Sequence, residues 1–170
     1  MSIPSRDRGD YMSNRTGYKI AVMSDVHANL PALRAVLNSI KERGCDIIYH
    51  LGDAVAIGPY PAESLQKLLN TPNLKMIMGN HDQWFAYGLP NPLPDWMSKG
   101  EIVHHEWLER SVNSELRQVV ADFPYTIREQ YGELDLVFTH YGFARQSKQF
   151  DNVIKNPKVK DLDQMFAHYG

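Results

Sequence analysis

The sequence predicts an α/β fold built around a parallel sheet. Three short, mostly apolar segments, residues 18–24, 46–51 and 74–78, have the length and composition of buried strands. Helical patterns over residues 29–44 and 61–70 separate these strands. An alternation of strand and helix is typical of parallel strands joined by right-handed crossovers. With 170 residues, 43% of them hydrophobic, the chain is long enough for one domain with a sizeable core.

The first helical segment carries start and stop signals. Asn29 suits an N-cap and Pro31 suits a first helical turn. Apolar residues recur at helical spacing from there, and Gly44 marks the end. The sequence therefore predicts a helix between the first two strands.

The pattern changes in the second half of the chain. A loop rich in proline is expected over residues 88–96, followed by helices around 101–108 and 113–121. Residues 125–129 and 134–139 predict a β-hairpin. A final helix is expected near the end of the sequence, with one apolar face formed by Leu162, Met165, Phe166 and Tyr169.

Composition narrows the domain organisation and the partners. Residues 1–17 are polar and lack the apolar core of a signal peptide, so we expect a flexible leader or an expression remnant, with 18–170 as a single domain. A formal net charge of −2 gives no electrostatic case for general binding to nucleic acid or to anionic membranes. The single cysteine, Cys45, rules out an internal disulfide and predicts a reducing, cytoplasmic location. No apolar run approaches the roughly 18–20 residues of a membrane-spanning helix.

Polar side chains follow the ends of four predicted strands. They are Asp25 and His27 after the first strand, Asp53 after the second, Asn80, His81 and Asp82 after the third, and His140 after the hairpin strand. Ligands of open α/β sheets bind outside the carboxyl ends of the strands. An extended backbone would direct the side chains of Asp25 and His27 to the same side. Gly52 and Gly79 would let the backbone turn sharply and approach a ligand.

These residues predict a metal site. Two carboxylates, an amide oxygen and two imidazoles, without a thiolate, suit Mn, Fe, Zn or Mg. Asp53, on the central strand, can bridge two ions about 3.5–4 Å apart, which would activate a shared water and clamp a phosphoryl group. His81, next to the ligand Asn80, would then protonate the leaving group.

Taken together, the motifs resemble the calcineurin-like metallophosphoesterases over residues 18 to about 142. They are Ser24-Asp25-x-His27, Gly52-Asp53-x(4)-Gly58, Gly79-Asn80-His81-Asp82 and the strand-end His140. The resemblance implies a four-layer α-β-β-α sandwich, in which helices flank two packed sheets. It also implies that Asp25 and His27 hold one metal, Asn80 and His140 hold the second, Asp53 bridges them, and His81 assists the leaving group.

The sequence departs from the family pattern in two places. Ala56 and Ile57 stand where the Ser/Thr protein phosphatase branch has an acid and a phosphate-binding arginine, so the chain looks more like the small prokaryotic-type phosphoesterases. The late Gly-His-x-His motif is absent, which leaves five of seven expected ligands. The C-terminal strands are therefore expected to be missing, either because the chain is a fragment or because it is naturally shortened. An exposed sheet edge would then favour association between copies of the chain.

Other polar and aromatic residues receive more ordinary interpretations. The His104-His105-Glu106 run is predicted to be a solvated helix face, because adjacent helical side chains point about 100° apart. His168 is interpreted as a helix-end residue. Asp82 is a candidate for orienting His81. The aromatic residues that follow it, Trp84, Phe85 and Tyr87, either anchor the core or form a rim around the substrate.

The leading hypothesis is a metal-dependent hydrolase of phosphate esters, with a hydroxide bridging two divalent ions and manganese as the favoured metal. Its substrate would be a small-molecule phosphate ester or a nucleotide, and both diesters and monoesters fit. Two alternatives stay open at this point. One is a catalytically impaired or inactive relative that serves as a protein-binding scaffold, and the other is a mononuclear metal hydrolase.

Overall fold

The computed structural model describes residues 17–95, 97–144, 149–151 and 153–169. The predicted leader, residues 1–17, lies outside the described part except for Gly17.

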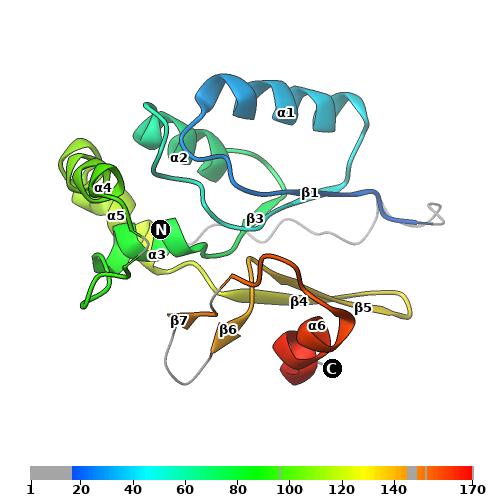
Figure 1. Ribbon diagram of the computed structural model, residues 1–170. Coiled ribbons are helices and arrows are strands. Elements are labelled where there is room, and N and C mark those ends of the chain that lie inside the picture. Colours follow the sequence, from blue (N-terminus) through cyan, green and yellow to red (C-terminus); the bar gives the residue numbers. More distant parts are fainter. Residues whose placement is uncertain (1–16, 96, 145–148, 152, 170) are drawn as a thin grey trace.

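The fold has four layers (Figure 1). Helices α1 (Leu30–Glu42) and α2 (Pro61–Leu69) cover one face of a parallel sheet. The sheet has β2 (Ile47–His50) in its centre, between β1 (Ile20–Met23) and β3 (Leu74–Met76). The antiparallel hairpin of β4 (Thr126–Tyr131) and β5 (Leu134–Thr139) forms the next layer, and α6 (Val159–Phe166) lies outside it. This arrangement confirms the predicted α-β-β-α sandwich.

Aromatic side chains hold the two sheets together. The Tyr49 ring of β2 stacks on the Phe138 ring of β5, with centroids 3.7 Å apart. The hydroxyl group of Tyr49 also lies 2.6 Å from that of Tyr131 on the hairpin. On the opposite face of the parallel sheet, α1 and α2 bury leucines that include Leu33 and Leu65. The central strand is therefore packed on both faces, which fixes the loop that follows it.

The first strand differs from its prediction. A buried strand over residues 18–24 was expected, but β1 covers only Ile20–Met23, and Val22 is 54% exposed. The reason is the position of β1 at the edge of the sheet, where it pairs with β2 alone among the described strands. Helix α1 follows as predicted, with Asn29 Oδ1 accepting the N–H of Ala32.

A group of three helices lies beside the sheets. Helices α4 (Lys99–Ser111) and α5 (Ser114–Ala121) confirm two predicted helices, and both pack against α3 (Asn80–Tyr87). Helix α3 has no counterpart in the sequence prediction. Phe85 of α3 is fully buried, whereas Tyr87 is 61% exposed, so the aromatic run divides between core and surface.

The last part of the described chain departs further from prediction. Short strands β6 (Phe143–Ala144) and β7 (Gln149–Phe150) pair with each other and were not predicted. In α6 and the 3-10 turn Ala167–Tyr169, Met165 and Tyr169 are buried, but Leu162 and Phe166 are exposed. The single apolar face expected there is therefore only half covered by the described residues. None of the described helices has the length and apolar character needed to cross a membrane.

Candidate metal centre

The predicted ligands come together at the carboxyl ends of the strands, from loops that leave the extended conformation at once. Asp25, His27 and Asp53 have positive φ angles of 56°, 45° and 58°. The expectation that extended backbone aligns Asp25 with His27 is therefore wrong. A left-handed turn brings them together instead, with Asp25 Oδ1 3.5 Å from His27 Nε2. Positive φ is uncommon for residues other than glycine and costs conformational energy, which the surrounding structure must offset.

Two glycines allow the loops to approach each other closely. A Cβ on Gly52 would lie 2.5 Å from the backbone nitrogen of Gly79, and Gly52 also has a φ of +99°. A Cβ on Gly79 would lie 2.2 Å from Oδ1 of Asp53. Both glycines therefore allow the expected close approach. They bring the loop after β2, which carries Asp53, against the loop after β3.

Asp53 lies at the centre of the cluster. Its Oδ2 atom is 3.6 Å from Nε2 of His27 and 3.6 Å from Nε2 of His140. Its Oδ1 atom accepts the backbone N–H of His81 at 2.9 Å. Asp53 belongs to two sets of three residues whose possible ligand atoms lie within 4.8 Å of one another. The first set is His27, Asp53 and His81, and the second is Asp25, Asp53 and His140.

A backbone carbonyl orients the His140 ring. Its Nδ1 lies 2.7 Å from the carbonyl oxygen of Leu51, which can only accept, so Nδ1 carries the proton. In the neutral ring Nε2 then presents a lone pair, and it faces Oδ1 of Asn80 at 3.1 Å. In this tautomer the two atoms both offer lone pairs, and a cation bound by both would satisfy them. Outer hydrogen bonds of this kind commonly orient metal-binding histidines.

The donor set fits divalent ions. Atoms that bind one ion at about 2.1 Å lie roughly 3.0–3.4 Å apart at tetrahedral or octahedral angles, slightly closer than the 3.5–3.6 Å separations seen here. Burial, followed by the charge of Asp82, raises the pKa of the Asp53 carboxyl to about 8. A bound cation would relieve this cost by favouring the carboxylate.

Asp82 has a role that the sequence analysis missed. Its fully buried carboxylate accepts backbone N–H groups from Asp53 (2.7 Å), Ala54 (3.0 Å), Val55 (3.3 Å) and Gly79 (3.0 Å). It therefore shapes the Asp53 loop and does not orient His81 through a described hydrogen bond. Its place three residues after the helix cap Gly79 is the signal that could have found it, since acidic side chains there bind backbone N–H groups.

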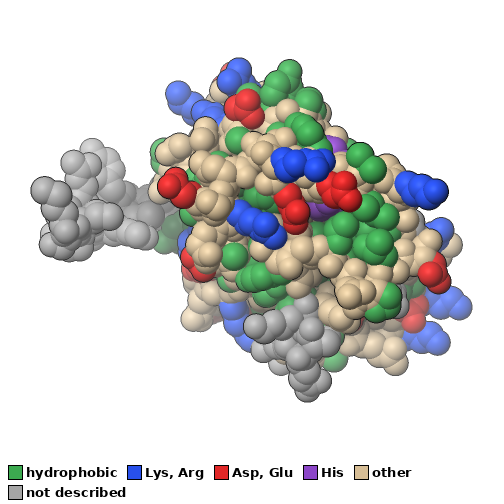
Figure 2. All heavy atoms as spheres, turned by 90° about the vertical axis from the view of Figure 1, so that its left-hand side faces the viewer, with side chains coloured by type: hydrophobic (Ala, Val, Ile, Leu, Met, Phe, Trp, Pro, Cys, Tyr) green, Lys and Arg blue, Asp and Glu red, His purple; other side chains and the backbone are tan. Residues whose placement is uncertain are grey.

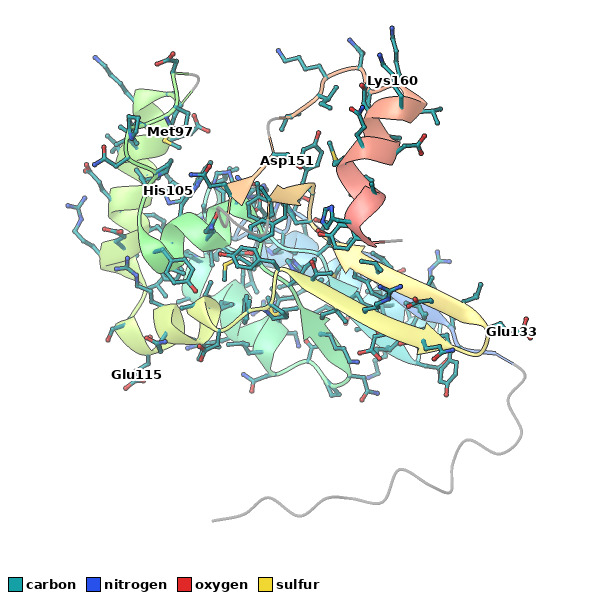
Figure 3. All side chains as sticks on the ribbon, turned by 90° about the horizontal axis from the view of Figure 1, so that it is seen from below. Met97, His105, Glu115, Glu133, Asp151 and Lys160 are labelled. Atoms are coloured by element: carbon teal, nitrogen blue, oxygen red, sulfur yellow. The ribbon has the colours of Figure 1, made fainter. Side chains whose placement is uncertain are left out.

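The predicted solvated face at His104-His105-Glu106 is wrong for His105. His105 is only 3% exposed, and its Nε2 lies 3.1 Å from Nδ1 of His81. Figure 3 labels His105 on α4. The two rings are nearly parallel, with an interplanar angle of 9°. His105 precedes the buried Leu108 by three residues on α4, so both lie on the face packed toward α3.

A cavity of about 330 Å³ opens beside His81. Its lining comes mainly from α4 and comprises Ile57, His81, Ser98, Gly100, Glu101, His104 and His105. Figure 2 shows the face of the molecule that carries α4 and α5, where acidic, basic and hydrophobic side chains are interspersed and histidines are visible between them. His81 therefore lies between the metal-binding cluster and an open cavity.

Comparison with known proteins agrees with this geometry. A family model described as calcineurin-like phosphoesterase matches residues 18–168. The chain belongs to the calcineurin-like phosphoesterase family. The four layers, and the cluster of Asp and His side chains at the strand ends, are consistent with membership of this family.

The individual relatives are longer than this member of the calcineurin-like phosphoesterase family. An uncharacterized protein of Methanocaldococcus jannaschii, MJ0912, is 36% identical over 122 residues, which cover 71% of this chain and 48% of the relative. A metallophosphoesterase structure from Sphaerobacter thermophilus has 27% identity and a TM-score of 0.55, covering 81% of this chain and 51% of that one. A hypothetical protein from Pyrococcus horikoshii OT3, PH1004, shares the fold with a TM-score of 0.70 at 22% identity, covering 88% of this chain and 64% of that one. The chain spans about half the length of the curated relative it matches.

Proposed function

We propose that this chain carries the centre of a metal-dependent phosphoesterase that uses two divalent ions. Asp25, His27, Asp53, Asn80 and His140 would hold the ions, with Asp53 shared between them. The observation that carries the proposal is the position of Asp53 Oδ2, 3.6 Å from the Nε2 atoms of both His27 and His140. A single carboxylate placed between two imidazoles is the arrangement that a bridging ligand requires.

The chemistry divides between the ions and the protein. When bound, two such ions supply an activated water and stabilise the charge on the phosphoryl oxygens, a function that Mn, Fe, Zn and Mg can all perform, with Mn favoured for this mixed oxygen and nitrogen set. His140 keeps Nε2 free for its role because its Nδ1–H donates a hydrogen bond to the carbonyl oxygen of Leu51. His81 gives a proton to the oxygen that leaves phosphorus, and its backbone N–H bond to Asp53 ties it to the centre.

The substrate class follows from the space beside His81. The cavity of about 330 Å³ falls at the lower end of the range for small-molecule sites, so a small phosphate ester or a nucleotide suits it. Both diesters and monoesters fit such a centre, and comparing the hydrolysis of an aryl phosphodiester with that of an aryl phosphomonoester tests the choice between them.

The test is the variant His81→Ala, assayed with added manganese on an aryl phosphodiester. We expect turnover to fall about 10²–10⁴-fold, the usual contribution of general acid catalysis, while the number of bound ions per chain stays unchanged. Equal turnover in the variant would remove the role of His81. A chain that binds no ions and hydrolyses neither ester would contradict the proposal and support the scaffold alternative.

A further inference from the structure

His81 and His105 form a buried pair at the edge of the candidate centre. Nδ1 of His81 lies 3.1 Å from Nε2 of His105, and both side chains are less than one-tenth exposed. Trp84 packs its ring edge-on against both imidazoles, with centroids 4.7 Å from His81 and 5.5 Å from His105. The orientation of His81 is therefore fixed from two sides.

Each of the two contacting nitrogens can donate or accept, and exactly one proton can lie between them. In a neutral His105 ring one nitrogen carries a proton and the other presents a lone pair. If that nitrogen is Nε2, the proton between the rings belongs to Nδ1 of His81. The other nitrogen of His81, Nε2, is then left for the substrate.

From this geometry we infer that His105 is a positioning residue for the proton donor His81. The inference rests on the proposed phosphoester hydrolysis. Nε2 of His105 accepts the Nδ1–H of His81, which fixes the orientation of the ring and leaves its Nε2 for the leaving oxygen. During hydrolysis the bond from phosphorus to the leaving oxygen breaks, and its electron pair goes to that oxygen. The proton on Nε2 of His81 transfers to the same oxygen, and His81 is left neutral with its Nδ1–H still bonded to His105.

His105 takes the part that a carboxylate would otherwise play in orienting the proton donor His81. Ala56, fully buried, stands at the position where the sequence comparison with the protein phosphatase branch expects an acidic residue. No described carboxylate lies within hydrogen-bond distance of the His81 ring. The imidazole of His105 takes the position that orients His81, and it comes from α4, a separate helix that also lines the cavity.

The first test is spectroscopic and needs neither metal nor turnover. Nitrogen-15 NMR of the metal-free full chain should show His81 in a single tautomer, with a slowly exchanging proton on Nδ1. His105→Phe keeps a ring but removes the acceptor, so this proton signal should be lost. His105→Gln places an amide oxygen where Nε2 stood and should retain it. An unchanged signal in His105→Phe would overturn the inference.

The second test uses two substrates that differ only in the leaving group. Methyl phenyl phosphate has a poor leaving group and needs the proton, whereas methyl 4-nitrophenyl phosphate needs it much less. In His105→Phe we expect kcat to fall about 10–100-fold for the phenyl ester and less than about threefold for the nitrophenyl ester, with His105→Gln recovering most of the loss. A purely structural role would lower both by the same factor, and that result would overturn the inference, as would the absence of any loss.

Controls separate the possible causes of failure. Val103→Ala changes an exposed residue of the same helix, and it should leave both esters unaffected. If His105→Phe does not fold, His105→Asn replaces it, because its shorter amide does not reach the position of Nε2.

Wild-type chain that shows the NMR signature but hydrolyses neither ester would contradict the proposed function alone. Hydrolysis by wild-type chain without that signature would contradict only the role of His105.

Discussion

The carboxylate of Asp82 accepts a hydrogen bond from the backbone N–H of Asp53 at 2.7 Å. The same carboxylate binds three more backbone N–H groups, and it is fully buried. One side chain on α3 therefore determines the course of the loop that follows the central strand. The position of Asp53, the proposed shared ligand, depends on this contact.

Asp82→Asn should destabilise the protein and weaken metal binding. The amide group presents one acceptor and one donor, so at least one backbone N–H of the loop loses its partner in a buried site. An unsatisfied buried donor costs about 1–3 kcal/mol, and we expect a loss of that size in the free energy of unfolding, measured with urea on metal-free chain. Asp163→Asn, at an exposed position on α6, should change it by less than about 0.5 kcal/mol. Equal effects of the two variants would contradict the structural role of Asp82.

Gly79→Ala should disrupt the metal centre from its backbone side. The added Cβ would lie 2.2 Å from Oδ1 and 2.3 Å from the backbone nitrogen of Asp53, neither of which can move without shifting the loop. We expect a loss of about 1–3 kcal/mol in stability and a lower content of both ions, measured by elemental analysis after dialysis. Gly17→Ala, where nothing lies within 4 Å, is the matched control. Full metal content in Gly79→Ala would show that the Asp53 loop adapts to the added methyl group.

The location of the centre could be predicted because it depends on topology. Asp53 and His140 follow apolar runs that could only be strands, and the carboxyl ends of such strands are where α/β proteins bind ligands. The layers followed from the resemblance, and Asn29 capped α1 as its position suggested. The strand ends and the helix cap could be predicted because their signals lie in residues close together in sequence, whereas the layers depended on the family resemblance.

The parts that could not be predicted depend on contacts between distant segments. His105 is buried because α4 packs against α3, and adjacent histidines on a helix give no local signal of which one faces inward. The segment of α3, Asn80–Tyr87, begins with polar residues and lacks a clear apolar stripe, so its helix was not expected. The positive φ of Asp25 likewise has no sequence signal, because glycine is the residue that usually adopts it.

Substitutions of the proposed ligands should show whether the chain binds one metal ion or two. Asp53→Asn weakens the shared ligand, so both ions should be lost, whereas His140→Ala removes a ligand of one ion and should leave about one per chain. His168→Ala, at an exposed position of the 3-10 turn, is the matched histidine control and should keep the wild-type content. Metal per chain after dialysis measures all three. Loss of a single ion in Asp53→Asn would contradict the shared position of Asp53 and favour a mononuclear site.

The buried side chain of His50 should make the stability of the protein depend on pH. The side chain is fully buried at the end of β2, and its Nδ1 accepts the N–H of Gly52 at 3.3 Å. Burial lowers the pKa of His50 to about 4 from its ordinary value of 6.5. The unfolded chain therefore binds this proton more readily than the folded one. The contribution of His50 to stability is complete above about pH 6.5 and is lost as the pH falls toward 4.

His50→Asn should make the protein less sensitive to acid. The asparagine oxygen can accept the Gly52 N–H in place of Nδ1, and the amide does not titrate. A pKa difference from 6.5 to about 4 corresponds to about 3 kcal/mol, so between about pH 7 and pH 4 the free energy of unfolding should fall by about 3 kcal/mol less in the variant than in the wild type. Urea titrations in the presence of a metal chelator measure this difference across the pH range. Parallel curves for the two proteins would mean that His50 takes up its proton equally in the folded and unfolded chains, and that its burial does not set the acid limit of the fold.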